Sequence, residues 1–114
     1  MTSSDAATPF LVLSESDADR KWKIQVDGLT TVVLEENAAS TGYVWRYEPA
    51  VGTQGLFQLL TDNFLPGGPV PGVPGAHVFL LNATRAGTTS LRFGLYPPVK
   101  PRPEREITFD IDIV

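Results

Sequence analysis

The last stretch of the chain, residues 104–114, reads EREITFDIDIV. From position 107 onward its apolar residues alternate one by one with polar residues. Strict alternation is the period of a β-strand that has one face buried and the other in water. The apolar members are Ile107, Phe109, Ile111 and Ile113, and the polar members are Thr108, Asp110 and Asp112. This stretch therefore predicts a strand, with the two aspartates on its solvated face.

The same period recurs along the chain between turn-forming residues. Residues 21–26 and 30–35 predict two strands that are joined as a hairpin by the turn dipeptide Asp27-Gly28. Residues 43–47 predict a strand with Tyr43, Trp45 and Tyr47 on one face. No segment keeps a helical period over ten or more residues. The remaining predicted strands cover residues 10–13, 56–64, 77–82 and 88–96.

Seven or eight short strands separated by turn signals predict an all-β fold, which we interpret as an immunoglobulin-like antiparallel β-sandwich. A chain of 114 residues is the size of one domain. Residues 1–9 are mostly small or polar, and we expect them to form a flexible N-terminus before a single sandwich domain over residues 10–114. The chain has no Cys, so apolar packing must replace the disulfide that joins the sheets of antibody domains.

Composition argues against several classes of partner. The formal net charge is −4 and the nine basic residues are spread along the chain, which argues against nucleic-acid binding. No apolar run approaches the ~20 residues of a membrane span, so we expect no membrane association. The first residues lack the basic and apolar regions of a signal peptide. We therefore favour a cytoplasmic location, and we expect a monomer.

Catalysis has little support in the sequence. His77 is the only histidine and would have to be the base of any serine-type triad, but the chain has no GxSxG motif. No spacing of Asp or Glu around His77 indicates a metal site. We expect His77, at the start of a predicted strand, to lie on the surface or at the rim. The prediction is a protein that is not an enzyme and has no cofactor or metal.

Three loops remain as candidates for a binding site: loop 1 (residues 36–42), loop 2 (residues 65–76) and loop 3 (residues 97–103). Loop 2 reads LPGGPVPGVPGA, and eight of its twelve residues are Pro or Gly, which rules out a regular strand throughout. In a Greek-key sandwich, loops separated in this way can cluster at one end. Spacing alone leaves open whether they form a binding wedge or are ordinary connections.

The order and content of these loops resemble the chagasin-like inhibitors of papain-family cysteine proteases. Members of that family carry an NPTTG loop, a GxGG loop and an RPW/F loop on an immunoglobulin-like sandwich. Residues 38–42, AASTG, with the aromatic strand that follows, resemble the first motif. Residues 72–75, GVPG, resemble the second, and residues 96–99, YPPV, resemble the third. The resemblance covers about residues 22–114.

The resemblance implies a reversible protein inhibitor that occludes the catalytic cleft of a papain-like cysteine protease with three loops. Because Pro97 and Val99 stand where the family has Arg and an aromatic residue, the alternative is a non-inhibitory binding or accessory module on the same fold. The residues implied to bind the protease are Ala39, Ser40, Thr41 and Gly42 in loop 1, Gly72, Val73, Pro74 and Gly75 in loop 2, and Pro97, Pro98 and Val99 in loop 3.

Overall fold

The computed structural model describes residues 7–37, 41–49, 55–68 and 73–114, and within them it is an all-β structure. The described residues contain seven strands and one short 3-10 turn, η1 (Glu15–Asp17). The all-β class and the lower of the two predicted strand numbers are confirmed. The strands are β1 (Thr8–Ser14), β2 (Lys21–Glu36), β3 (Val44–Tyr47), β4 (Phe57–Leu65), β5 (Gly75–Ala83), β6 (Gly87–Tyr96) and β7 (Arg105–Ile113).

The N-terminal boundary differs slightly from the expectation. Strand β1 begins at Thr8, so Thr8 and Pro9 belong to the sheet although the sequence analysis placed them in the N-terminal segment. Residues 1–6 lie outside the described residues. The described part of the chain contains no helix with the length and apolar character of a membrane span.

Strand β2 is the main departure from the sequence prediction. The expected hairpin at Asp27-Gly28 is wrong, because residues 21–36 form one continuous strand. Its first part, residues 21–24, pairs in parallel with β7. Its second part, residues 29–36, pairs antiparallel with β5. The dipeptide forms a bulge rather than a turn. Thr8 of β1 is paired with Ile24 of β2, and the next pair is Phe10 with Leu29, so β2 contains extra residues between the two pairs.

The bulge is held by contacts that the dipeptide itself makes possible. Asp27 has a φ of 69°, in the left-handed region that Asp tolerates better than most residues. A Cβ atom on Gly28 would lie 2.6 Å from Cγ1 of Ile24 and 2.8 Å from the carbonyl oxygen of Pro9. The side-chain amide of Asn82, oriented to satisfy both of its polar atoms, donates to the carbonyl oxygens of Asp27 and Gly28 at 3.2 and 3.3 Å. Asn82 of the Asn-Ala-Thr sequence thus braces the bulge.

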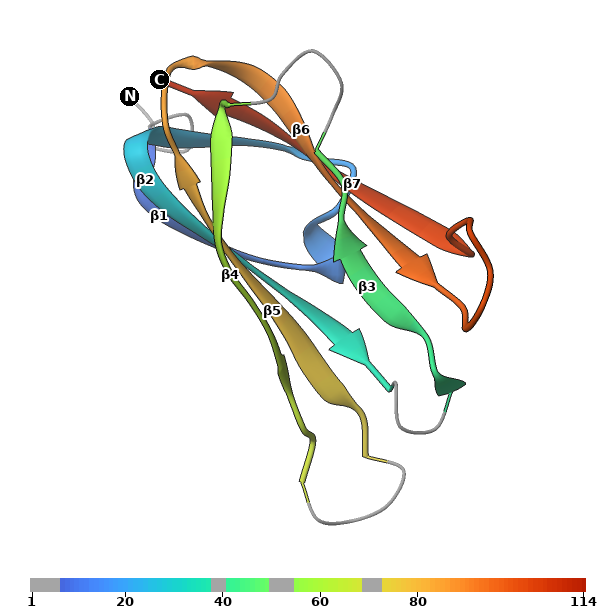
Figure 1. Cartoon of the computed structure of the whole chain (residues 1–114). Helices are drawn as coiled ribbons and strands as arrows, with labels where there is room; N and C mark the ends of the chain where they lie inside the picture. Colours follow the sequence, from blue (N-terminus) through green and yellow to red (C-terminus); the bar gives the residue numbers. More distant parts are fainter. Residues whose placement is uncertain (1–6, 38–40, 50–54, 69–72) are drawn as a thin grey trace.

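The sheet curls so that its two halves face each other (Figure 1). The strand order is β3-β6-β7-β2-β5-β4, with β1 added in parallel beside β2. Two of the pairings, β1 with β2 and β2 with β7, are parallel, whereas the sequence analysis expected only antiparallel pairs. The immunoglobulin-like order of strands stays a prediction.

Aromatic rings join the two halves across the core. Phe79 of β5 and Phe93 of β6 have ring centroids 4.8 Å apart, although β7 and β2 separate their strands in the sheet order. Phe93 also packs against Phe109 at 6.0 Å and Tyr47 at 5.5 Å. Such pairs stabilise a core beyond the area they bury. Apolar packing therefore takes the place of a disulfide, as the absence of Cys required.

The strand faces follow the alternation in the sequence. In β7 the apolar members are buried, and Asp110 is exposed. Asp110 accepts a hydrogen bond from Ser90, and Asp112 pairs with Lys21 at 3.5 Å, so the two aspartates form a bonded stripe on the outer face. In β3, Trp45 is buried while Val44 and Arg46 on the opposite face are exposed.

Replacing Trp45 with Ala tests the buried aromatic face of β3. Because the side chain is 1% exposed, we expect the change to cost about 3–5 kcal/mol of unfolding free energy, measured by chemical denaturation. Val44→Ala, on the outer face of the same strand, is the matched control and should cost less than about 0.5 kcal/mol. Equal costs for the two variants would contradict the assignment of faces.

Candidate functional site

The three candidate loops emerge at one end of the molecule (Figure 1), which we call the loop end. At the base of loops 1 and 2, Glu36 at the end of β2 is paired with Gly75 at the start of β5. At the base of loops 1 and 3, Val44 at the start of β3 is paired with Tyr96 at the end of β6. Loop 1 therefore passes from one half of the curled sheet to the other, with loop 2 on one side and loop 3 on the other.

The two described ends of loop 1 are hydrogen-bonded to each other. The backbone N–H and the hydroxyl of Thr41 both donate to the carbonyl oxygen of Asn37, each at 2.9 Å. The Thr41 hydroxyl also accepts from the N–H of Tyr43 at 3.2 Å. Thr41 thus organises the backbone of its own loop. Ala39 and Ser40 lie outside the described residues.

Loops 1 and 3 touch each other directly. Gly42 has a φ of 76°, and a Cβ atom added to it would lie 2.6 Å from Cγ of Pro98. The hydroxyl of Tyr43, just after loop 1, donates to the Glu104 carboxylate, just after loop 3, at 3.1 Å. This hydrogen bond, with the negative charge of Glu104, raises the pKa of the Tyr43 phenol. The phenol therefore stays a donor across the neutral range.

Loop 2 begins and ends as a narrow neck. A Cβ atom on Gly67 would lie 2.2 Å from the carbonyl oxygen of Pro74, and one on Gly75 would lie 2.3 Å from that of Leu65. The ring of Phe64 covers Gly75, with Cζ 2.6 Å from the same Cβ position. Only glycine fits these two positions without a shift of the neck. Gly72 lies outside the described residues, and Val73 is exposed.

Loop 3 exposes two of its three predicted residues. Pro97 is buried, whereas Pro98 and Val99 are exposed. Val99 is fully exposed and has a φ of 54°, which a β-branched residue rarely adopts. Of the basic residues in and after this loop, Lys100 and Arg102 are exposed, whereas Arg105 forms an ion pair with Glu15 and its guanidinium lies 5.7 Å from the centroid of the Trp45 ring. Loop 3 therefore projects an apolar tip at Val99.

His77 differs most from its sequence expectation. It is buried, not on the surface or at the rim, because its side chain lies on the inward face of β5 with Phe79, onto which its ring stacks at 4.3 Å. Nδ1 lies 2.9 Å from a carboxylate oxygen of Glu36, and Nε2 contacts the Asp62 carboxylate. Glu36 is itself buried and accepts from the N–H of Trp45 at 2.6 Å.

The sequence analysis missed this cluster, although one signal was available. His77 precedes Phe79, Leu81 and Ala83 at a spacing of two, so it shares their buried face. Glu36 and Asp62 are 41 and 15 residues away in the chain, and only the folded sheet brings them together. The carboxylates lie at opposite ring nitrogens and do not converge. Accordingly, the residues that the structure describes contain no group of three or more His, Cys, Asp or Glu arranged to hold a metal ion.

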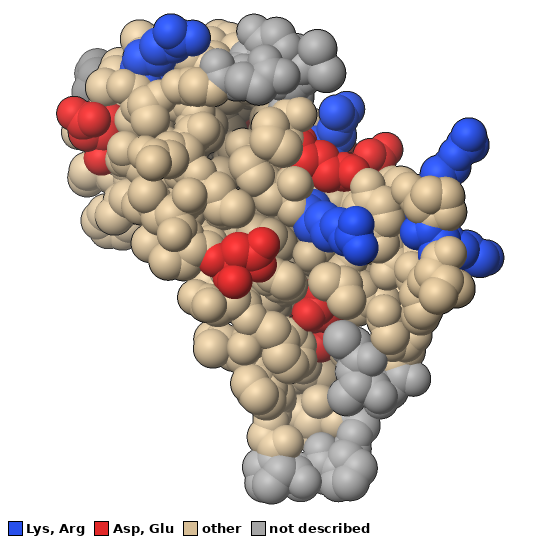
Figure 2. Space-filling model, viewed as in Figure 1, with Lys and Arg blue, Asp and Glu red and all other residues tan. Residues whose placement is uncertain are grey.

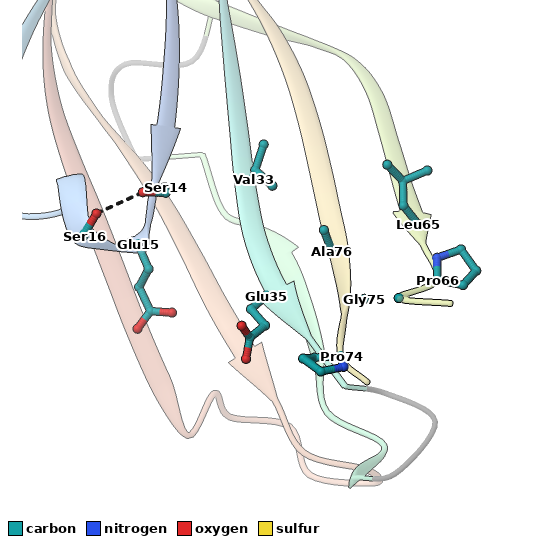
Figure 3. A pocket seen from close by; sticks show the side chains of 11 residues that line it. Ser14, Glu15, Ser16, Val33, Glu35, Leu65, Pro66, Pro74, Gly75 and Ala76 are labelled. Atoms are coloured by element: carbon teal, nitrogen blue, oxygen red, sulfur yellow. Dashed lines mark hydrogen bonds between the residues drawn. The ribbon is translucent and has the colours of Figure 1, made fainter. Parts of the chain in front are cut away.

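Charge is unevenly distributed over the loop end. In Figure 2 the described part of the tapered lower end is mostly tan, with blue and red side chains above it. Loop 3 carries the exposed Lys100 and Arg102. Beside the neck of loop 2 is an open groove of about 590 Å³. Figure 3 shows its floor on β2 and β5, with Val33 and Ala76, between Glu15 on one side and Leu65 on the other. The loop end thus combines apolar surface at the neck of loop 2 with acidic side chains, Glu15 and Glu35, in the groove beside it.

A family model described as chagasin family peptidase inhibitor I42 matches residues 23–113. Among solved structures, a cysteine protease inhibitor from Entamoeba histolytica, EhICP2, is 24% identical, with a TM-score of 0.78, and the match covers 92% of this chain and 96% of that one. The solution structure of amebosin is 19% identical, with a TM-score of 0.74, and the match covers 94% of this chain and 100% of that one. PbICP-C, solved in complex with falcipain-2, is 16% identical, with a TM-score of 0.57, and the match covers 86% of this chain and 92% of that one. No curated protein matches the sequence.

A double-mutant cycle tests the contact between loops 1 and 3. Gly42→Ala should cost about 2 kcal/mol of unfolding free energy, since it combines a strained φ with a clash against Pro98. In a Pro98→Ala background, which lacks the clashing Cγ, the same change should cost about 1 kcal/mol less. Chemical denaturation of the four proteins measures the coupling. An equal cost in both backgrounds would mean that the two loops do not touch.

Proposed function

The chain belongs to the chagasin family of peptidase inhibitors, and from that membership and the geometry of the loop end we propose that it is a reversible inhibitor of papain-family cysteine proteases. The proposed inhibitor places loop 1 at the catalytic cleft, with Thr41 and Gly42 nearest the protease's catalytic residues. Loop 2 covers the cleft on one side and loop 3 braces its rim on the other.

The observation that carries the proposal is the mutual bracing of the three loops. Loop 1 is fixed to loop 3 by the Gly42–Pro98 contact and the Tyr43–Glu104 hydrogen bond. It is fixed to the base of loop 2 through Glu36 and His77. A surface whose parts are already held together loses little conformational entropy when it binds. The loop end is thus suited to enter a cleft as a single body.

The proposed mechanism is occlusion without chemistry. The chain has no Cys, and the proposal assigns no reactive group to the inhibitor. The Thr41 N–H donates to the carbonyl oxygen of Asn37, so the two ends of loop 1 are held close together. A protease cleaves a chain that lies extended through its active site, and a loop whose ends are bonded to each other is poorly suited to do so. Reversible binding and an uncut inhibitor follow from this geometry.

The first test is titration of papain with the protein. We expect inhibition with an inhibition constant of about 1 μM or lower, and an inhibitor that is recovered intact after prolonged incubation. Residual protease activity gives the constant, and mass spectrometry of the recovered chain shows whether it was cut. A folded protein that leaves papain and a cathepsin L-type enzyme uninhibited at micromolar concentration would favour the non-inhibitory binding module.

A second test addresses loop 3. Val99→Asp should weaken inhibition about ten-fold, because it puts a charge at the apolar tip that the proposal buries against the protease. Stability should be unchanged, since the position is fully exposed and Asp accepts a positive φ more readily than Val. The matched control is Val114→Asp, an exposed valine just after β7 at the opposite end. If both variants keep the wild-type inhibition constant, loop 3 is not part of the interface.

A further inference from the structure

The cluster of Glu36, His77 and Asp62, in which the first two side chains are buried, has no part in occlusion itself, yet it lies where loops 1 and 2 begin. Glu36 is the last residue of β2, directly before loop 1. His77 lies two residues after the first residue of β5, and Asp62 lies three residues before the end of β4. The three side chains therefore connect both arms of loop 2 to the start of loop 1.

Glu36 also reaches across loop 1. Its carboxylate accepts the backbone N–H of Trp45, on the far side of that loop, at 2.6 Å. The indole N–H of Trp45 donates to the carbonyl oxygen of Glu35 at 2.9 Å. Glu36 thus connects β2, β3 and β5 at one buried point.

The cluster needs a proton to be satisfied. Among the described residues, the charged groups against the imidazole are Glu36 from β2 at Nδ1 and Asp62 from β4 at Nε2, while Phe79 of its own strand stacks on the ring. A neutral imidazole has one N–H, so it can donate to only one of two ionised carboxylates. Removing the shared proton leaves a ring nitrogen and a carboxylate oxygen facing each other as acceptors, which is costly for buried groups.

We propose that the Glu36–His77–Asp62 cluster is a proton-dependent latch that holds the bases of loops 1 and 2 together, and that inhibition weakens when the latch loses its proton. This proposal rests on the proposed function. Asp62 is the partner free to leave, because its side chain is 44% exposed, against 2% for Glu36. Loss of the proton frees the Asp62 side chain from His77 at the base of loop 2, while the backbone pairing of β4 with β5 stays in place.

The sign of the effect follows from the geometry. Protonation supplies the second donor, so the latch is closed when the imidazole carries both protons and opens when a rise in pH removes one of them. Affinity for the protease should therefore be highest at acidic pH. His77 is the only histidine in the chain, so any imidazole signal that changes with pH in the inhibitor comes from this residue.

The first arm of the test uses the free protein. NMR follows the His77 imidazole from pH 5 to pH 9, together with the backbone amides of Thr41, Gly42, Gly75 and Ala76. We expect one imidazole titration, with the amides of both loops shifting at the same midpoint. An imidazole that does not titrate, or that titrates without moving the amides of both loops, overturns the proposal.

The second arm measures the inhibition constant for papain at pH 5.5 and pH 8.0. Comparing Asp62→Asn with wild type at each pH cancels the pH dependence of the protease itself. The variant should bind about ten-fold more weakly than wild type at pH 5.5, and the two should differ little at pH 8.0. The matched control is Asp110→Asn, which removes an exposed carboxylate from β7 and should follow wild type at both pH values.

The two proposals fail in different ways. If wild type does not inhibit papain at either pH, the proposed function is wrong, and the NMR arm still decides whether the latch exists. If wild type inhibits and the ratio between Asp62→Asn and wild type is the same at both pH values, the latch is wrong and the inhibitor remains.

Discussion

The fold depends on one strand that serves both halves of the sheet. Strand β2 pairs first with β7 and then, after the bulge at Asp27-Gly28, with β5 and β1. A straight strand of this length would hold the sheet flat, whereas the bulge increases the local twist and lets the sheet curl. The curl brings β5 and β6 face to face, so that Phe79 and Phe93 meet in the core. Everything at the loop end follows from where β2 finishes.

The end of β2 is also where structure and the proposed function meet. Glu36 leaves the sheet beside β5, and loop 1 then crosses to β3 in the other half. Loop 1 is consequently the central loop, with loop 2 attached to one half of the sheet and loop 3 to the other. Its contacts differ on the two sides: a buried charged cluster toward loop 2, and an apolar contact with an exposed hydrogen bond toward loop 3.

Much of the fold was predictable from the alternation of apolar and polar residues, because a strand with one buried face requires an apolar residue at every second position. This alternation correctly indicated the inward face of β7 and the burial of Trp45. Asp27-Gly28 was misread because the residues that permit a hairpin turn also permit a bulge. The choice between them is made by distant partners, here Ile24, Pro9 and Asn82. Parallel pairing of β2 with β7 leaves no local signal for the same reason.

The candidate site was predictable in its order but not in its internal contacts. The loops were located by resemblance, and their common end is a consequence of strand pairing. Gly42 and Gly75 also make contacts within the chain, to Pro98 and to Leu65, that the sequence did not indicate, and their contact with a protease stays a prediction. His77 was assigned to the surface or the rim because a single polar residue at the start of a strand is usually exposed, and its two carboxylate partners are far away in the sequence.

The central claim is that one end of the molecule enters the cleft of a papain-family protease as a braced unit. Hydrogen–deuterium exchange of the chain, free and in complex with inactivated papain, tests it most directly. The account predicts that the complex protects amides in loops 1, 2 and 3 together, and leaves the bulge at Asp27-Gly28 and the chain end at Val114 unchanged. Protection confined to the opposite end, or to the outer faces of β1 and β4, would contradict it.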